Sequence, residues 1–136
     1  MNATAITGGC LCGKVRYQIS GPLHDASHCH CSMCRRQHGA VFATYAQFEP
    51  GDFRWTAGEE LVKDFSPATG AGWCFCAECG STLGGTEDGK VMSITLGTVD
   101  GDPGVRPESH IFVGSKAGWH EIHDDLPQHD EWAPEA

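Results

Sequence analysis

The stretch HCHCSMCRRQHG, residues 28–39, places three cysteines, three histidines and two adjacent arginines on one short segment. Cysteine and histidine are the side chains that zinc prefers. Cys29, Cys31 and Cys34 follow the pattern CxCxxC, which brings three sulfurs within reach of one ion. The stretch therefore predicts a metal centre and raises the question whether that centre is structural or reactive.

The other five cysteines are clustered as well. Cys10 and Cys12 form a CxC pair, and Cys74, Cys76 and Cys79 form a second CxCxxC. This grouping favours metal ligation over a disulfide framework, because a bridge within CxC would strain the disulfide geometry. A reducing cytosol also opposes disulfides.

Length and charge limit the possible partners. The chain has 136 residues, of which 40% are apolar, and this predicts one domain over residues 1–136 with a modest core. The start MNATAITGG lacks the basic residues and apolar run of a signal peptide, and no later stretch has the roughly 20 apolar residues of a membrane span. We therefore expect a cytoplasmic protein without a membrane partner. A formal net charge of -9 repels phosphates, which argues against a nucleic acid partner.

The distribution of residues along the chain predicts a mainly β domain with little helix. Runs rich in Val, Phe, Tyr, Ile and Thr lie between Gly and Pro turn signals. One short helix is expected across residues 32–39, with Ser32 capping its start and Gly39 ending it. Residues from about 120 to 136 are expected to form an irregular, exposed tail. The expected strands are residues 14–19, 40–48, 61–65, 90–97 and 109–114.

Two pairs of cysteines predict a closed structural zinc site. Cys76 and Cys79 lie in CAECG, a CxxC-Gly knuckle whose backbone N–H groups can turn toward the sulfurs. Cys10 and Cys12, just before the first strand, supply the second pair. A four-cysteine zinc would tie the two halves of the domain together and offset its thin core, since metal binding is also folding free energy.

The remaining group, Cys29, Cys31 and Cys34, predicts a catalytic zinc. Three protein ligands leave a fourth position open for water or substrate. Three thiolates around a divalent ion leave about one net negative charge, so the centre activates water poorly and suits a soft ligand such as another thiolate. A zinc-bound thiolate stays deprotonated yet remains nucleophilic toward a small carbonyl. Four-cysteine iron or an iron-sulfur cluster fits the two-knuckle spacing less well.

Several further residues have a structural interpretation by default. Cys74 has three possible fates: a buried free thiol, which we favour, a fourth ligand of the three-cysteine group, or a redox partner. His28 and His30 alternate with Cys29 and Cys31, so in extended backbone they face away from the metal. Four histidines in the C-terminal part of the chain, His110, His120, His123 and His129, are expected to face solvent. The aromatic residues Phe42, Tyr45, Phe48 and Trp55 are expected to pack in the core or at its edges.

The chain resembles the glutathione-dependent formaldehyde-activating enzymes, which are grouped with centromere protein V. The motifs that carry the resemblance are GGCLCGKVRY (8–17), CHCSMCRRQHGAVF (29–42), FCAECGSTL (75–83) and HIFVGSKAGWHEI (110–122). The resemblance implies a tent-like zinc-binding β fold with two zinc ions, a structural one on Cys10, Cys12, Cys76 and Cys79 and a catalytic one on Cys29, Cys31 and Cys34. The implied activity is condensation of glutathione with formaldehyde to S-(hydroxymethyl)glutathione, a carbon-sulfur lyase reaction read in reverse.

The predicted mechanism places the glutathione sulfur at the open position of the three-cysteine zinc, where it adds to formaldehyde. Arg35 or Arg36 would pair with the glutathione carboxylates or with the negative metal centre. His30 or His38 would carry a proton. The residues predicted to act in catalysis are therefore Cys29, Cys31, Cys34, Arg35 and His38.

Two other functions remain open from the sequence. One is a lyase that acts on another thiol adduct, because the zinc chemistry constrains the sulfur and hardly constrains the electrophile. The other is a non-catalytic, zinc-stabilised binding domain of the centromere-protein type. The acidic charge disfavours a chromatin partner for such a domain.

Overall fold

The computed structural model describes residues 5–68 and 70–134, and within them the protein is mainly β with one α-helix. Three short 3-10 turns cover Glu59–Leu61, Leu96–Thr98 and Val113–Ser115. No helix in the described residues has the length and apolar character that a membrane span needs. The elements are β1 (Ile6–Gly9), β2 (Arg16–Ile19), β3 (His24–Cys29), α1 (Ser32–His38), β4 (Ala43–Gln47), β5 (Phe53–Ala57), β6 (Val62–Phe65), β7 (Ala71–Cys76), β8 (Thr82–Glu87), β9 (Lys90–Thr95) and β10 (Ser109–Ile111).

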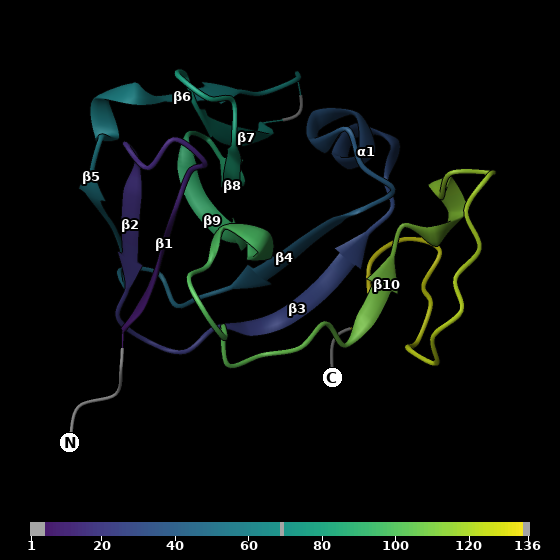
Figure 1. The fold of residues 1–136 in the computed structure, drawn as a ribbon. Coiled ribbons are helices and arrows are strands. Elements are labelled where there is room, and N and C mark those ends of the chain that lie inside the picture. Colours follow the sequence, from purple (N-terminus) through teal and green to yellow (C-terminus); the bar gives the residue numbers. More distant parts are fainter. Residues whose placement is uncertain (1–4, 69, 135–136) are drawn as a thin grey trace.

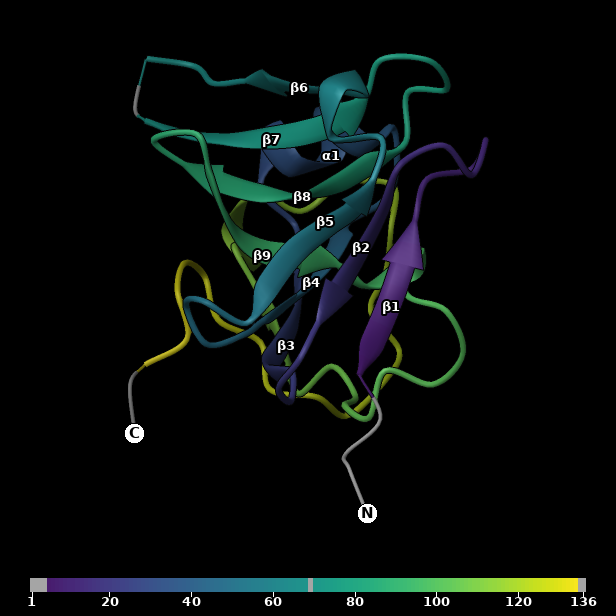
Figure 2. The same ribbon diagram turned by 90° about the vertical axis from the view of Figure 1, so that its left-hand side faces the viewer.

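The strands form two sheets (Figures 1 and 2). The smaller sheet has the order β1-β2-β5, and the larger has the order β10-β3-β4-β9-β8-β7-β6. Neighbouring strands are antiparallel except β10 and β3, which run parallel. Figure 2 shows the smaller sheet lying across one face of the larger one. The mainly β prediction is confirmed.

The main core lies between these sheets. In β2 the residues alternate between half-buried and buried positions, so that Tyr17 and Ile19 point inward. They belong to one buried cluster with Leu83 of β8 and Ile94 of β9, each of which is fully buried. This cluster also holds Cys10 and Cys76, so both halves of the predicted structural site border the main core.

A second, smaller core lies where β3 ends and α1 begins. Its buried members are Cys29, Cys34, Ala43, Trp73 and Ile111. Trp73 belongs to this cluster, whereas its neighbour Cys74 belongs to the main core, so β7 buries both of its faces. Two of the three cysteines of the predicted catalytic group therefore sit against apolar side chains.

The helix forms where it was predicted but is capped differently. Cys31, not Ser32, is the N-cap residue, and its Sγ accepts a hydrogen bond from the Cys34 amide. Gly39 ends the helix in the left-handed conformation at φ 60°, which glycine adopts without steric cost. The Ser32 cap prediction was wrong because a thiolate-forming side chain one residue earlier takes that role.

Five strands were predicted within the right segments, and five were missed. The predicted ones correspond to β2, β4, β6, β9 and β10, each shorter than expected. The missed ones include β1 and β8, whose glycines weaken the strand signal. Gly84 in β8 is needed because an added Cβ would lie under 3.0 Å from the backbone of Ser93 in β9. The other missed strands are β3, β5 and β7.

Between residues 120 and 134 the C-terminal tail contains no helix or strand, and it is attached to the body rather than free. The amide of His110 donates to Pro127 O (2.9 Å) and the amide of Phe112 donates to Glu131 O (2.9 Å). The Trp132 ring packs edge-on against Phe112 at 4.9 Å. Figure 1 shows this yellow segment running beside β10. The tail therefore extends the larger sheet beyond its edge strand.

Candidate functional site

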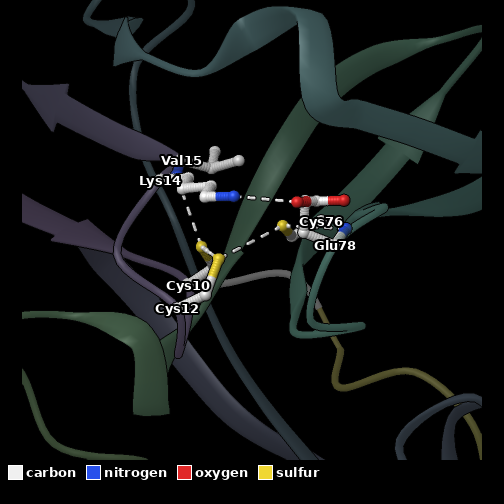
Figure 3. A network of polar contacts seen from close by, with 6 residues as sticks. All are labelled: Cys10, Cys12, Lys14, Val15, Cys76 and Glu78. Atoms are coloured by element: carbon white, nitrogen blue, oxygen red, sulfur yellow. Dashed lines mark hydrogen bonds and ion pairs between the residues drawn. The ribbon is translucent and has the colours of Figure 1, made fainter.

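The four cysteines predicted to form a structural site come together from two turns. Cys10 and Cys12 follow β1, whereas Cys76 ends β7 and Cys79 lies in the next turn. Their four Sγ atoms lie within 4.8 Å of one another, with 3.5 Å between Cys10 and Cys12 and 3.9 Å between Cys12 and Cys76. Figure 3 shows the sulfurs of Cys10, Cys12 and Cys76 close together. Two distant segments thus meet at one point.

Glycines and backbone amides shape both turns. Gly13 and Gly80 have φ values of 82° and 81°, a conformation that most other residues avoid. The amide of Val15 donates to Cys10 Sγ (3.3 Å), and the amide of Glu78 donates to Cys76 Sγ (3.4 Å). Hydrogen bonds from the Ser81 hydroxyl and backbone lower the pKa of Cys79 to about 5. These donors favour thiolates over thiols.

An ion pair joins the two turns on the outside. Lys14 Nζ donates to Glu78 Oε1 at 2.8 Å, as Figure 3 shows. Both side chains are at least half exposed, so the pair contributes little to stability by itself. The ion pair thus links the turn after β1 to the turn after β7 on their solvent-facing side as well.

The geometry of this cluster fits a tetrahedral metal ion. Zinc-sulfur bonds of about 2.3 Å in a tetrahedron place the sulfurs about 3.8 Å apart. The observed separations of 3.5 and 3.9 Å bracket that value. With four sulfurs the coordination shell is complete, which is typical of a structural zinc site.

The second group, Cys29, Cys31 and Cys34, is built from one strand end and one helix start. Cys29 ends β3, Cys31 caps α1 and Cys34 lies in the first turn of α1. Their Sγ atoms also lie within 4.8 Å of one another. Among the described residues no further cysteine, histidine or carboxylate joins this group.

The three sulfurs compete for charge. Hydrogen bonds from the Cys29 and Cys34 thiols lower the pKa of Cys31 to about 2, whereas the neighbouring thiols raise the pKa of Cys29. One sulfur thus ionises at the expense of another when only protein surrounds them. A divalent cation would relieve this competition, so the donor set fits a soft metal such as zinc.

Tyr45 contacts this centre, although the sequence predicted only a packing role for it. Its hydroxyl donates to Cys34 Sγ (3.5 Å) and accepts a hydrogen bond from Trp73 Nε1 (2.8 Å). The contact arises because β4 returns antiparallel to β3 beneath α1, with Ala43 opposite Cys29. Strand pairing around the helix was the missing information, and the local sequence does not carry it.

Helix α1 also carries the predicted His38 and Arg35. His38 Nδ1 donates to Cys34 O (2.9 Å), and its ring stands perpendicular to that of Tyr45 at 5.5 Å. His38 Nε2 is buried and has no hydrogen-bond partner within the described residues. Arg35 donates to Ser115 O (3.2 Å), and Arg36 is exposed. An open pocket of about 460 Å³ is lined by Arg35, Arg36, Gly39, Ala40, Val41 and Trp119.

One histidine, His110, corrects an expectation. His110 was expected to face solvent, yet it is 2% exposed, and His30 is fully buried. Their rings share a hydrogen bond of 2.8 Å between His30 Nε2 and His110 Nδ1. His28 packs its ring against Phe42 at 4.3 Å. The expectation for His110 was wrong because β10 pairs with β3, a contact between segments about eighty positions apart in the chain.

Cys74 lies away from both cysteine groups. It is 1% exposed, belongs to the main core, and points its sulfur toward Gly84 O at 3.8 Å. Burial raises the pKa of this thiol to about 12. Its surroundings correspond to the buried free thiol among the three alternatives, and it does not complete the three-cysteine group.

Comparison with known proteins gives the family. The family described as glutathione-dependent formaldehyde-activating enzyme matches residues 5–115, which include all eight cysteines. The chain belongs to this family. The resemblance seen in the cysteine motifs is thereby confirmed, and the family indicates glutathione-dependent formaldehyde activation.

One solved structure is similar to this chain in its fold. A crystal structure of a Rhodobacter sphaeroides protein is similar with a TM-score of 0.56 and 27% sequence identity. The match covers 71% of this chain and 89% of the other. No curated protein matches the chain.

Proposed function

We propose that the protein is a zinc-dependent carbon-sulfur lyase of the S-(hydroxymethyl)glutathione synthase type, which condenses glutathione with formaldehyde in the cytoplasm. Family membership supports the reaction class. The proposal includes two zinc ions, one on each cysteine group.

The difference between the two cysteine groups carries this proposal. One group offers four sulfurs and the other offers three. Cys10, Cys12, Cys76 and Cys79 would therefore hold a closed structural ion, whereas Cys29, Cys31 and Cys34 would leave a position for a substrate sulfur. Zinc bound at the second group would keep the entering thiol deprotonated near neutral pH.

Arg35 is proposed to bind a carboxylate of glutathione. It lies one residue after Cys34 and lines the open pocket beside α1. Within the described residues it forms no ion pair with a carboxylate, unlike Arg16 and Arg106, which pair with Asp100 and Asp102. In a chain with a net charge of -9, such a cation is a local attraction for an anionic substrate.

His38 is proposed to move the proton. Its Nδ1–H is held by Cys34 O, which leaves the lone pair on Nε2. In the reaction the glutathione sulfur forms a bond to the carbonyl carbon, the carbon-oxygen double-bond electron pair moves to oxygen, and the thiol proton ends on that oxygen. Nε2 would take the proton from sulfur and return it to oxygen.

The reaction itself is the test. Exchange NMR of formaldehyde with glutathione should show a faster approach to S-(hydroxymethyl)glutathione when the protein is present. Replacement Cys34→Ala should abolish the acceleration, whereas Cys74→Ala, a change at a buried cysteine outside both groups, should preserve it. The absence of acceleration by the unmodified, zinc-loaded protein near neutral pH would refute the proposed reaction.

A further inference from the structure

A chain of hydrogen bonds runs from the tail to the three-cysteine segment. Asp124 accepts from His110 Nε2, with 3.0 Å to Oδ2 and 3.1 Å to Oδ1. His110 Nδ1 in turn meets His30 Nε2 at 2.8 Å. Asp124 lies outside residues 5–115, so the match to the family does not extend to it.

The carboxylate determines the direction of these hydrogen bonds. The hydrogen bonds from His110 and from the Leu126 amide lower the pKa of Asp124, which therefore stays ionised and can only accept. His110 Nε2 must then carry a hydrogen. In a neutral His110 the Nδ1 lone pair accepts from His30 Nε2–H, which leaves the buried His30 Nδ1 without a hydrogen.

His30 stands between two of the cysteines. Its amide donates to Ile111 O (2.9 Å), and β3 pairs Cys29 with Ile111 and His28 with His110. In extended backbone the side chain of His30 points opposite to those of Cys29 and Cys31. Its ring and its amide thus anchor the segment from the side opposite the sulfurs.

The C-terminal tail positions Asp124 and His110, at the far end of this series of hydrogen bonds. His110 donates its amide to Pro127 O (2.9 Å) and accepts from the His129 amide at its carbonyl (2.9 Å). Backbone pairing therefore positions the tail on β10, while Asp124 fixes the ring of His110. The Asp124 side chain is 47% exposed, so its replacement removes little packing.

We propose that Asp124 is a positioning residue of the three-cysteine centre, acting through His110 and His30 to fix the backbone that presents Cys29 and Cys31. This inference rests on the metal ion proposed for that centre. Polar partners behind a metal ligand typically change metal affinity by about 10–100-fold when they are removed.

The test compares Asp124→Asn with Asp125→Asn, which removes the same charge from the neighbouring exposed residue. Release of zinc to an excess of a chromogenic chelator is followed without glutathione or formaldehyde, and Cys29→Ala identifies the phase that belongs to the three-cysteine centre. In Asp124→Asn that phase should become about tenfold faster, with the four-cysteine phase unchanged. Asp125→Asn should release zinc like the unmodified protein.

Nitrogen NMR of the imidazoles supplies a readout that general destabilisation would not produce. The unmodified protein should show His110 and His30 each with a hydrogen on Nε2, and Asp124→Asn should change this pattern at His110. Equal zinc release in both variants, equal acceleration of both phases, or retention of only one zinc by the unmodified protein would overturn the inference. The zinc-release assay contains neither glutathione nor formaldehyde. Its outcome therefore tests the role of Asp124 even if the protein does not catalyse the proposed reaction.

Discussion

The hydroxyl of Tyr45 connects two side chains with opposite requirements. It accepts from the indole N–H of Trp73 and donates to the sulfur of Cys34. A donor aimed at sulfur favours the thiolate, whereas the buried indole needs an acceptor. The Tyr45 hydroxyl therefore provides a hydrogen-bond acceptor for the buried Trp73 indole and a donor for Cys34, one of the three cysteines of the centre.

Replacing Tyr45 with Phe should impair the centre and the fold together. The Trp73 N–H would lose its partner at a cost of about 1–3 kcal/mol of unfolding free energy, and Cys34 would lose a donor. Urea unfolding should show a lower free energy of unfolding, and the NMR rate assay should show a smaller acceleration of the reaction. The control is Tyr17→Phe, because the other tyrosine hydroxyl contacts Thr98 (2.8 Å) in the main core. A rate decrease of the same size in the control would contradict a specific role for Tyr45.

Arg35→Gln tests the proposed carboxylate contact. Loss of one charge-assisted hydrogen bond of about 1.5–3 kcal/mol should raise the KM for glutathione roughly ten- to one-hundred-fold, with a smaller effect on kcat. The kinetics should be measured at low and high salt, since a charge contact weakens with ionic strength. The control is Arg54→Gln, because Arg54 lies on β5 of the smaller sheet and outside the pocket. An unchanged KM in Arg35→Gln would contradict the assignment.

At this scale the sequence predicted the cysteine groups but not their surroundings. The spacing of Cys29, Cys31 and Cys34 fixes their proximity locally, and the same is true within each pair of the other group. Tyr45 and His110 reach the centre only through strand pairing, between β3 and β4 and between β3 and β10. Such contacts depend on the register of distant segments, which the periodicity of a single strand does not determine.

Among the elements, the small sheet depends on close backbone approach. In β1 the glycine at position 8 pairs with Tyr17 of β2, and an added Cβ would lie under 3.0 Å from the Tyr17 hydroxyl and from Thr98 O. This explains why the segment is a strand despite its two glycines. It also places the turn containing Cys10 at a fixed distance from β2.

Gly8→Ala should therefore destabilise the fold. Overpacking of this kind costs about 1–3 kcal/mol of unfolding free energy, because the contacts include backbone that cannot move aside. Gly97→Ala is the matched control, since a Cβ there meets nothing within 4 Å. Chemical denaturation of both variants measures the difference. Equal stability of the two variants would show that the approach of β1 to β2 is looser than described.

For the whole molecule, the four-cysteine group joins the small sheet to the large one. Cys10 and Cys12 follow β1 of the small sheet, whereas Cys76 ends β7 of the large sheet and Cys79 lies in the turn after it. The main core between the sheets includes Cys10 and Cys76 themselves. A metal ion here would add to the stability that a small core provides.

Cys76→Ala should lower both the zinc content and the thermal stability. Loss of one ligand should release one of two zinc ions and cost several kcal/mol, because metal binding contributes to folding. Cys74→Ala is the control, since it truncates a buried cysteine two positions away in the same strand without touching a ligand group. Elemental analysis and calorimetry give the two readouts. A melting temperature equally lowered in both variants, with zinc retained, would contradict the structural role.

Cadmium NMR of the protein loaded with two cadmium ions tests the central claim most directly, because the cadmium shift reports the number of bound sulfurs. Addition of glutathione should move the resonance of the three-cysteine centre toward that of a four-sulfur site and leave the resonance of the four-cysteine centre in place. If neither resonance moves at saturating glutathione, the three-cysteine centre does not accept a substrate sulfur, and the account of its chemistry is wrong.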